Sequence, residues 1–334
     1  MKTLISLLLS LTASAALATP IPQNPVQVND KAMLQIVAAD AQFELLAEGF
    51  RWAEGPVVDP KTGDLLFSDV PENKVWRWSE RPEHRGLSLY LQPSGYSQLT
   101  DEPNLGEGSN GLMFNQQGQL VLAQHGDRRL ALLTGVNNGK PQYRTLVTSY
   151  QQQLLNSPND VVQHQSGAYY FTDPPYGLKN GDDSAQKQLK FNGVYRYQSG
   201  EPLQLLSDAL TRPNGLAFSP DQQFLYVANS DPQAAQWWRF ALKPDGFAGA
   251  AELFFDATAK VATEAGLPDG LKVLKSGHLL ATGPGGVWVF DPQARHLGTI
   301  RTGVAAANVA LSPDQRWLYV TASSYLLRIR LQAQ

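Results

Sequence analysis

Short stretches of alternating apolar and polar residues recur along most of the chain. In each stretch, aromatic and β-branched residues alternate with polar ones over four to six positions, and turn-forming residues lie at both ends. Alternation with a period of two, in segments of this composition, is typical of strands that bury one face. The clearest examples are residues 74–78, 193–197, 237–240, 286–290 and 325–330. The pattern predicts a chain built from many short β-strands.

Helical patterning is scarce beyond the first residues. We find no later segment of ten or more residues that combines helical periodicity with capping residues. Residues 151–155 and 257–266 are each expected to form a single helical turn.

A longer phrase recurs six times: a small polar word, an apolar pair, a turn containing Gly or Asp, and a short hydrophobic strand. Successive phrases are separated by 39 to 56 residues, near the period of about 40 to 50 expected of a propeller blade. Their leading polar residues are Glu54, Asn110, Asn159, Asn214, Asp269 and Asn308. The repeat therefore predicts an all-β fold, a six-bladed β-propeller with an axial metal site, closed as one domain.

The N-terminal residues are typical of a secretory signal peptide. Met1 and Lys2 precede an apolar run from Leu4 to Leu11, and residues 16–18 read Ala-Leu-Ala, a small-x-small cleavage signal. We therefore expect a signal peptide at residues 1–18, an N-terminal extension at 19–44 and the propeller at 45–334. The predicted product is exported, periplasmic or secreted. Because no later apolar stretch approaches a membrane span and radial closure leaves no long free edge strand, we expect no membrane association and a monomer.

Composition narrows the chemistry. The 334 residues include no Cys and only five His, which excludes thiolate metal sites and a cysteine nucleophile and favours oxygen ligands. The formal net charge is −3, and no basic block appears, so a nucleic-acid partner is not expected.

The six leading residues of the repeat should form a ring near the propeller axis, because equivalent positions of each blade reach the same height. All six carry a side-chain oxygen, and two are carboxylates. Such a set fits one hard divalent cation, Ca²⁺ before Mg²⁺. The alternative is that these are ordinary turn words, in which Asn and Asp bond their own backbone. Turn chemistry alone does not favour Glu54, so we predict a cation site.

Other candidates follow the inner strands of the second and third repeats, where loops on one face should meet substrate. These are His125, Asp173 and Tyr176. His125 could move a proton or serve as a structural hydrogen-bonding group. Asp173 could cap a turn, and Tyr176 could cover a pocket or pack between blades.

Five words in order make the chain similar to the gluconolactonase family, which includes the senescence marker protein regucalcin. They are Ala53-Glu-Gly-Pro56, Leu155-Asn-Ser-Pro-Asn-Asp160, Phe171-Thr-Asp-Pro-Pro-Tyr-Gly177, Arg212-Pro-Asn-Gly215 and Leu267-Pro-Asp-Gly270. The resemblance implies a six-bladed propeller that hydrolyses lactones with an axial Ca²⁺ or sometimes Zn²⁺. It places the metal ligands at Glu54, Asn159, Asn214 and Asp269, and the general base at Asp269. Asn110, His125, Asp173 and Tyr176 are then expected to contact substrate.

The favoured interpretation is a metal-dependent hydrolase that opens a sugar lactone to an aldonic acid with an activated water. One alternative keeps the metal but changes the substrate to a phosphotriester or aryl ester, or makes the chain a strictosidine-synthase-like relative. Another is a propeller without activity that binds a ligand and holds the ion for structural reasons only.

Overall fold

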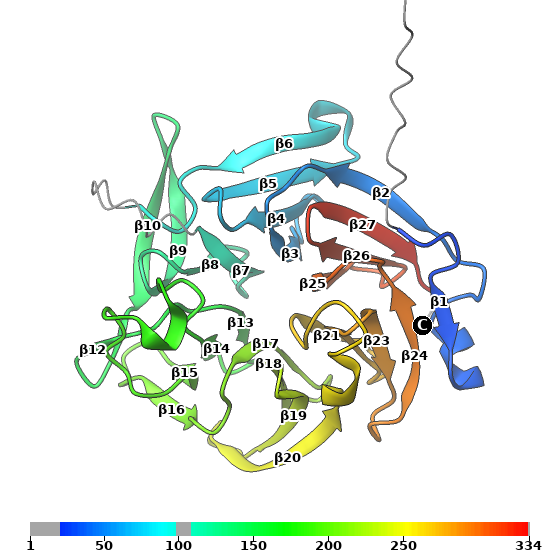
Figure 1. Cartoon of the computed structure of the whole chain (residues 1–334). Helices are drawn as coiled ribbons and strands as arrows, with labels where there is room; N and C mark the ends of the chain where they lie inside the picture. The colour runs from blue at the N-terminus through cyan, green and yellow to red at the C-terminus, as the bar shows by residue number, and fades with distance from the viewer. Residues whose placement is uncertain (1–20, 98–107, 333–334) are drawn as a thin grey trace, which may run out of the picture.

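Six antiparallel sheets are arranged around a central axis, and the chain runs through them in sequence order (Figure 1). The structure is a computed structural model and describes residues 21–97 and 108–332. This architecture confirms the predicted all-β, six-bladed propeller. The predicted signal peptide lies outside the described residues.

Blades one to three each contain four strands, ordered from the axis outward. They are β3 (Ala53–Val58), β4 (Leu65–Asp69), β5 (Lys74–Ser79) and β6 (Gly86–Leu91); β7 (Ser109–Phe114), β8 (Leu120–Gln124), β9 (Arg129–Asn137) and β10 (Lys140–Val147); and β13 (Val161–Gln163), β14 (Tyr169–Asp173), β15 (Gly193–Tyr197) and β16 (Gln204–Ser207). A small ribbon of β11 (Ser149–Tyr150) and β12 (Gln153–Leu154) links blades two and three.

Blades four to six complete the ring. They are β17 (Pro213–Phe218), β18 (Phe224–Asp231), β19 (Ala234–Leu242) and β20 (Ala248–Asp256); β21 (Leu271–Val273), β22 (Leu279–Gly283), β23 (Gly286–Phe290) and β24 (His296–Arg301); and β25 (Ala306–Leu311), β26 (Trp317–Ala322) and β27 (Tyr325–Arg330). All five alternating segments singled out in the sequence lie within β5, β15, β19, β23 and β27.

The N-terminal segment contributes to two blades. Strand β2 (Phe43–Glu48) pairs antiparallel with β27 and supplies the outermost strand of blade six, and β1 (Val26–Val28) extends blade five beside β24 (Figure 1). Most of the segment expected as an extension is thus tied to the propeller. The ring is closed by a sheet that combines both ends of the domain.

Helical structure in the described residues is limited to four short 3₁₀ helices: η1 (Lys31–Gln35), η2 (Pro82–His84), η3 (Gly181–Asp183) and η4 (Thr258–Lys260). The turn expected at 257–266 is present as η4. The turn expected at 151–155 is wrong, because this segment forms the tight connection into β12. Gln151 and Gln152 adopt positive φ there, which a right-handed helical turn does not allow.

The core lies between the blades. Six apolar clusters are buried, and each combines side chains from two neighbouring sheets. Between blades four and five, for example, Trp237 of β19 packs against Trp288 and Phe290 of β23, with ring centroids 5.4 and 5.2 Å apart. Burial of aromatic strand faces against the next blade is the main favourable term for a stacked repeat. It leaves the axis free for polar side chains.

Candidate active site

The innermost strands bring five of the six ring residues into one axial cavity of about 680 Å³. The predicted site residues that line this cavity are Glu54, Asn110, His125, Asn159, Tyr176, Asn214 and Asp269. They come from five different blades. Asp173 is the predicted site residue that does not line it, and Asn308 of the ring lies beside it rather than on its wall.

Two local features explain how these side chains face the axis. In blades one, two and four, the pairing of the two inner strands shifts register at the ring position, between Glu54 and Val57 in blade one. Such bulges re-aim side chains and are frequent beside active sites. In addition, a glycine follows four of the ring residues. A Cβ on Gly215 would lie 2.3 Å from the Asp269 carbonyl oxygen, so only glycine permits this approach.

Hydroxyl groups of the second strands hold the next blade at the same height. Ser68 Oγ donates to the Asn110 carbonyl at 2.8 Å, and Thr172 Oγ1 donates to the Asn214 carbonyl at 2.6 Å. Thr282 Oγ1 donates in the same way to Ala307, at 2.9 Å. These buried bonds fix the inner strands relative to one another, and therefore the ring.

Glu54 and Asp269 bring two carboxyl groups to the wall of the cavity. Burial raises the pKa of the Glu54 carboxyl, and the charge of Asp160 raises it further. Burial also raises the pKa of Asp269 well above its ordinary range, and the charges of Glu54 and Asp160 add to the rise. Three buried acids in mutual range are costly when ionised unless positive charge lies near them, and Lys272 supplies part of it for Glu54 and Asp160.

Several oxygens at the axis have no hydrogen-bond partner. These are Oδ1 of Asn110, Asn214 and Asp269, all buried. The orientation of Asn214 is fixed, because its Nδ2 donates to Ser230 Oγ at 2.9 Å. Buried unpaired oxygens from separate strands are rare in folded proteins and require an explanation. One divalent cation bound by oxygen would satisfy Asn214 and Asp269, two of the four predicted ligands, so the residues present fit the predicted ion.

The other ring members differ from this pattern. Asn308 donates from Nδ2 to Glu54 Oε2 at 3.0 Å, while its Oδ1 accepts from its neighbour Val309 N at 2.8 Å. It therefore orients Glu54 and has no role as an open ligand. Within residues 21–97 and 108–332, no three His, Cys, Asp or Glu side chains are grouped for metal binding. The candidate ligand set depends on amide oxygens as well as carboxylates.

Tyr176 and His125 lie on the cavity wall near the ring. Tyr176 is 36% exposed, and its hydroxyl reaches inward. Burial of that hydroxyl and the nearby charge of Asp269 raise its pKa, against the effect of contacts with Ser230 and Asn214. His125 is buried, and Gly177 packs against its Cβ. The loop that carries Tyr176 is thus packed directly onto the second blade.

Asp173 does not line the cavity, and its carboxylate bonds backbone N–H groups, as the turn-capping alternative expects. Its Oδ2 accepts from Asn156 N at 2.7 Å and its Oδ1 from Ser157 N at 2.8 Å, and the residue is fully buried. Asp69 accepts from two backbone N–H groups in the same way in blade one. In both blades the bonded residues precede the ring position by two or three places. Asp173 therefore fixes the backbone two and three residues before Asn159.

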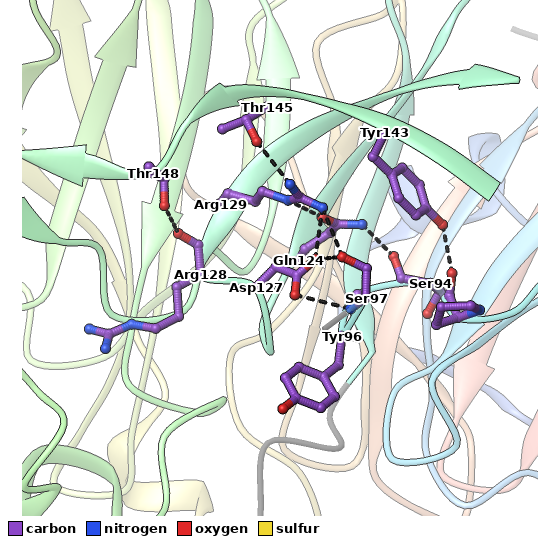
Figure 2. A network of polar contacts seen from close by, with 12 residues as sticks. Ser94, Tyr96, Ser97, Gln124, Asp127, Arg128, Arg129, Tyr143, Thr145 and Thr148 are labelled. Atoms are coloured by element: carbon purple, nitrogen blue, oxygen red, sulfur yellow. Dashed lines mark hydrogen bonds and ion pairs between the residues drawn. The ribbon is translucent and has the colours of Figure 1, made fainter. Parts of the chain in front are cut away.

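A polar network anchors residues 93–97 on blade two (Figure 2). Asp127 accepts from Ser97 N at 3.0 Å and pairs with Arg129 at 2.7 Å, and Arg129 also donates to Gln124 at 2.6 Å. Arg128 points away from this network and donates to backbone carbonyls, with Leu155 O at 2.6 Å (Figure 2). Its guanidinium holds a loop and does not line the cavity.

The sequence did not reveal Trp52, Ser230 and Glu264, which also line the cavity. Trp52 immediately precedes the first inner strand, and Ser230 lies near the C-terminal end of β18. Glu264 lies between η4 and β21, in the connection that leads into blade five. The repeat carried no signal for it.

Comparison with known proteins gives a consistent result. Residues 52–324 match the family described as the SMP-30/gluconolactonase/LRE-like region. A gluconolactonase of Zymomonas mobilis is 36% identical over 300 residues, covering 88% of this chain and 83% of the relative. A gluconolactonase structure from Xanthomonas campestris aligns with a TM-score of 0.79 and 30% identity over 96% of this chain and 99% of that chain.

A more distant structure shares the fold. A calcium-binding regucalcin of Agrobacterium tumefaciens aligns with a TM-score of 0.66 and 19% identity, covering 87% of this chain and 94% of that one. In the described residues, no helix is long and apolar enough to cross a bilayer.

Proposed function

The chain belongs to the SMP-30/gluconolactonase/LRE-like family, and from this premise we propose that it is a gluconolactonase-like hydrolase that depends on one divalent cation. Its substrate is a lactone, opened by water to the hydroxy acid. The observation that carries the proposal is the set of three unpaired amide and carboxylate oxygens beside Glu54, in a cavity large enough for a sugar lactone.

Glu54, Asn159, Asn214 and Asp269 would hold the cation, and Ca²⁺ is the ion that an all-oxygen set favours over Zn²⁺ or Mg²⁺. When bound, the ion supplies Lewis-acid polarisation of the lactone carbonyl and offsets the charge of the acids. Asn308 keeps Glu54 in place through its 3.0 Å bond, and Ser230 keeps the oxygen of Asn214 turned inward. The aligned regucalcin structure is described as a calcium-binding protein, which supports this choice of ion.

Asp269 would take the proton from the attacking water. Its carboxylate has two oxygens, so one can hold the cation while the other accepts the proton within the cavity. The hydroxyl of Tyr176 and the side chains of Asn110 and His125 lie around the same space, where they can orient the ring and the carbonyl of the lactone. These residues supply position, and Asp269 supplies the base.

The decisive test is hydrolysis followed by pH-stat, with glucono-1,5-lactone and a panel of simple lactones, before and after treatment with a chelator. We expect turnover that chelation abolishes and added Ca²⁺ restores. Turnover of paraoxon or phenyl acetate that exceeds turnover of every lactone would favour the phosphotriester or aryl-ester alternative. Complete absence of turnover, with a ligand still bound in the cavity, would favour the binding propeller.

The remaining sequence-based expectations become part of the proposal. Residues 1–18 would direct export to the periplasm or the medium, and residues 19–334 would be the mature, monomeric protein. N-terminal sequencing of the secreted product would test the cleavage point, and sedimentation would test the monomer. Neither outcome bears on the chemistry of the axial site.

A further inference from the structure

The cavity wall carries a third carboxylate besides Glu54 and Asp269. This is Glu264, and apolar side chains line other parts of the same cavity: Trp52, Val70, Pro71, Val261 and Leu267. Such walls bind the carbon face of a ligand and leave orientation to a few polar groups. Glu264 is the residue on this wall with the strongest acceptor.

The guanidinium of Arg301 in β24 contacts both carboxylate oxygens of Glu264. Its Nη2 lies 2.5 Å from Glu264 Oε2, and its Nη1 lies 3.3 Å from Oε1. The Glu264 side chain is 26% exposed. A carboxylate offers about four acceptor positions, and Arg301 takes one on each oxygen, so about two remain for a ligand. The paired guanidinium also balances the formal charge of the carboxylate.

The backbone of this segment is fixed as well. Glu264 N donates to Lys260 O at 3.0 Å, and Gly285 N donates to Ala265 O at 2.7 Å. Arg301 is held from its other side, where its backbone N donates to Pro25 O at 2.7 Å and its Nη1 contacts Gln27. The acceptor is therefore preorganised by blade five and the strand β1 that extends it, which is the condition for a selective contact.

We propose that Glu264 is a specificity-determining residue that accepts hydrogen bonds from ring hydroxyls of a polyhydroxylated lactone, while Trp52 and its apolar neighbours cover the carbon face. This inference rests on the proposed lactonase function and names the substrate class of the same cavity. A lactone without hydroxyl groups would leave the Glu264 oxygens desolvated and without a donor. Sites built to bond a hydroxyl discriminate strongly against analogues that lack it.

The test compares two substrates and three variants. Glu264→Gln and Glu264→Ala are assayed by pH-stat on glucono-1,5-lactone and on unsubstituted δ-valerolactone, with kcat and KM determined separately. Glu252→Gln is the matched control, because Glu252 also pairs with an arginine, Arg239, but lies outside the cavity. Thermal unfolding of each variant confirms that the fold is kept.

For the two Glu264 variants we expect kcat/KM on glucono-1,5-lactone to fall about 10- to 100-fold, mainly through KM, as for loss of a charge-assisted hydrogen bond. On δ-valerolactone the change should stay below about twofold. Glu252→Gln should behave as wild type on both. Equal losses on both lactones, or no loss on either, would overturn the assignment of Glu264.

Two results with the wild-type protein separate this inference from its premise. If the protein hydrolyses neither lactone, the proposed function itself is wrong and the inference falls with it. If it hydrolyses δ-valerolactone but does not prefer the hydroxylated substrate, the lactonase proposal stands and the selectivity assigned to Glu264 is wrong.

Discussion

Asp173 and Asp269 are two enclosed aspartates with opposite surroundings. Both have a pKa raised by burial. Each carboxylate oxygen of Asp173 accepts from a backbone N–H group, and the residue is buried at the end of β14 in blade three. Asp269 borders the cavity and leaves Oδ1 without a partner. Burial and a shifted pKa are common to both, so neither identifies a site by itself. The unsatisfied oxygen facing a cavity makes the difference.

The contrast also separates Asp173, which acts on stability, from Asp269, which acts on function. The two N–H bonds to Asp173 organise its loop and offset part of the cost of burying its charge. At Asp269 the charges of Glu54 and Asp160 add to the cost of burial, a contact with Asn214 offsets only part of it, and the carboxylate is retained where binding of a charge compensates. Substitution of each residue by Asn should therefore have opposite consequences.

Removal of the divalent cation should give the largest effect. We expect dialysis against chelator to abolish lactone hydrolysis and added Ca²⁺ to restore it. Because a ligand that binds only the folded state stabilises it, Ca²⁺ should also raise the unfolding temperature, measured by calorimetry. Asp173→Asn should retain this Ca²⁺-dependent rise, and Asp269→Asn should lose most of it. A rise of equal size in both variants would contradict the ligand assignment.

Asp269→Asn should reduce kcat/KM by about 10²- to 10⁴-fold, the range typical of a lost general base. The cation-free variant should be at least as stable as cation-free wild type, because the substitution relieves repulsion from Glu54 and Asp160. Steady-state kinetics and urea unfolding without added metal would check both. Near wild-type turnover would exclude Asp269 as the base.

Asp173→Asn should act on stability instead. An ordinary aspartate ionises near 3.8, while burial raises the pKa of folded Asp173 to about 7. The folded state thus binds more protons between these values, and its stability decreases as pH rises through that window, by about 1.4 kcal/mol per unit. The variant lacks this dependence. Urea unfolding should show a larger deficit relative to wild type at pH 5 than at pH 8, and an equal deficit would contradict the assignment.

Tyr176→Phe should give the smallest effect, about a two- to tenfold rise in KM, because one neutral hydrogen bond near the ring is lost. The ring remains to cover the mouth, so kcat should change little. Initial rates over a range of lactone concentrations would measure the split. A fall in kcat as large as that of Asp269→Asn would give Tyr176 a place in the chemistry.

The sequence carried enough information for the fold and the ring because both repeat. Six copies of one phrase place equivalent residues at one height, and five of the six leading residues do line the cavity. The role of Asn308 could not be read from this pattern, since its amide is turned towards Glu54 by a local bond to Val309. Repetition specifies position, while each side chain's orientation depends on its neighbours.

Features that do not repeat could not be predicted from the sequence pattern. Glu264 lies in the connection between blades four and five, outside the repeated phrase, and its partner Arg301 is 37 residues away in the chain. The pairing of β1 with β24 involves only three residues without clear alternation. The bonds made by Asp173 could not be predicted for a related reason. A motif lists neighbours along the chain, but the N–H groups that occupy its carboxylate come from the preceding loop.

Because β2 completes blade six, this blade can close only after the last strand has been synthesised. Residues 43–48 leave the ribosome among the first of the domain, yet their partner strand β27 ends at Arg330 and is made last. Ala305 and Ala306, which complete the cavity wall, belong to that same final portion. Until synthesis is finished, the early strand has no edge to join and the cavity has an open side.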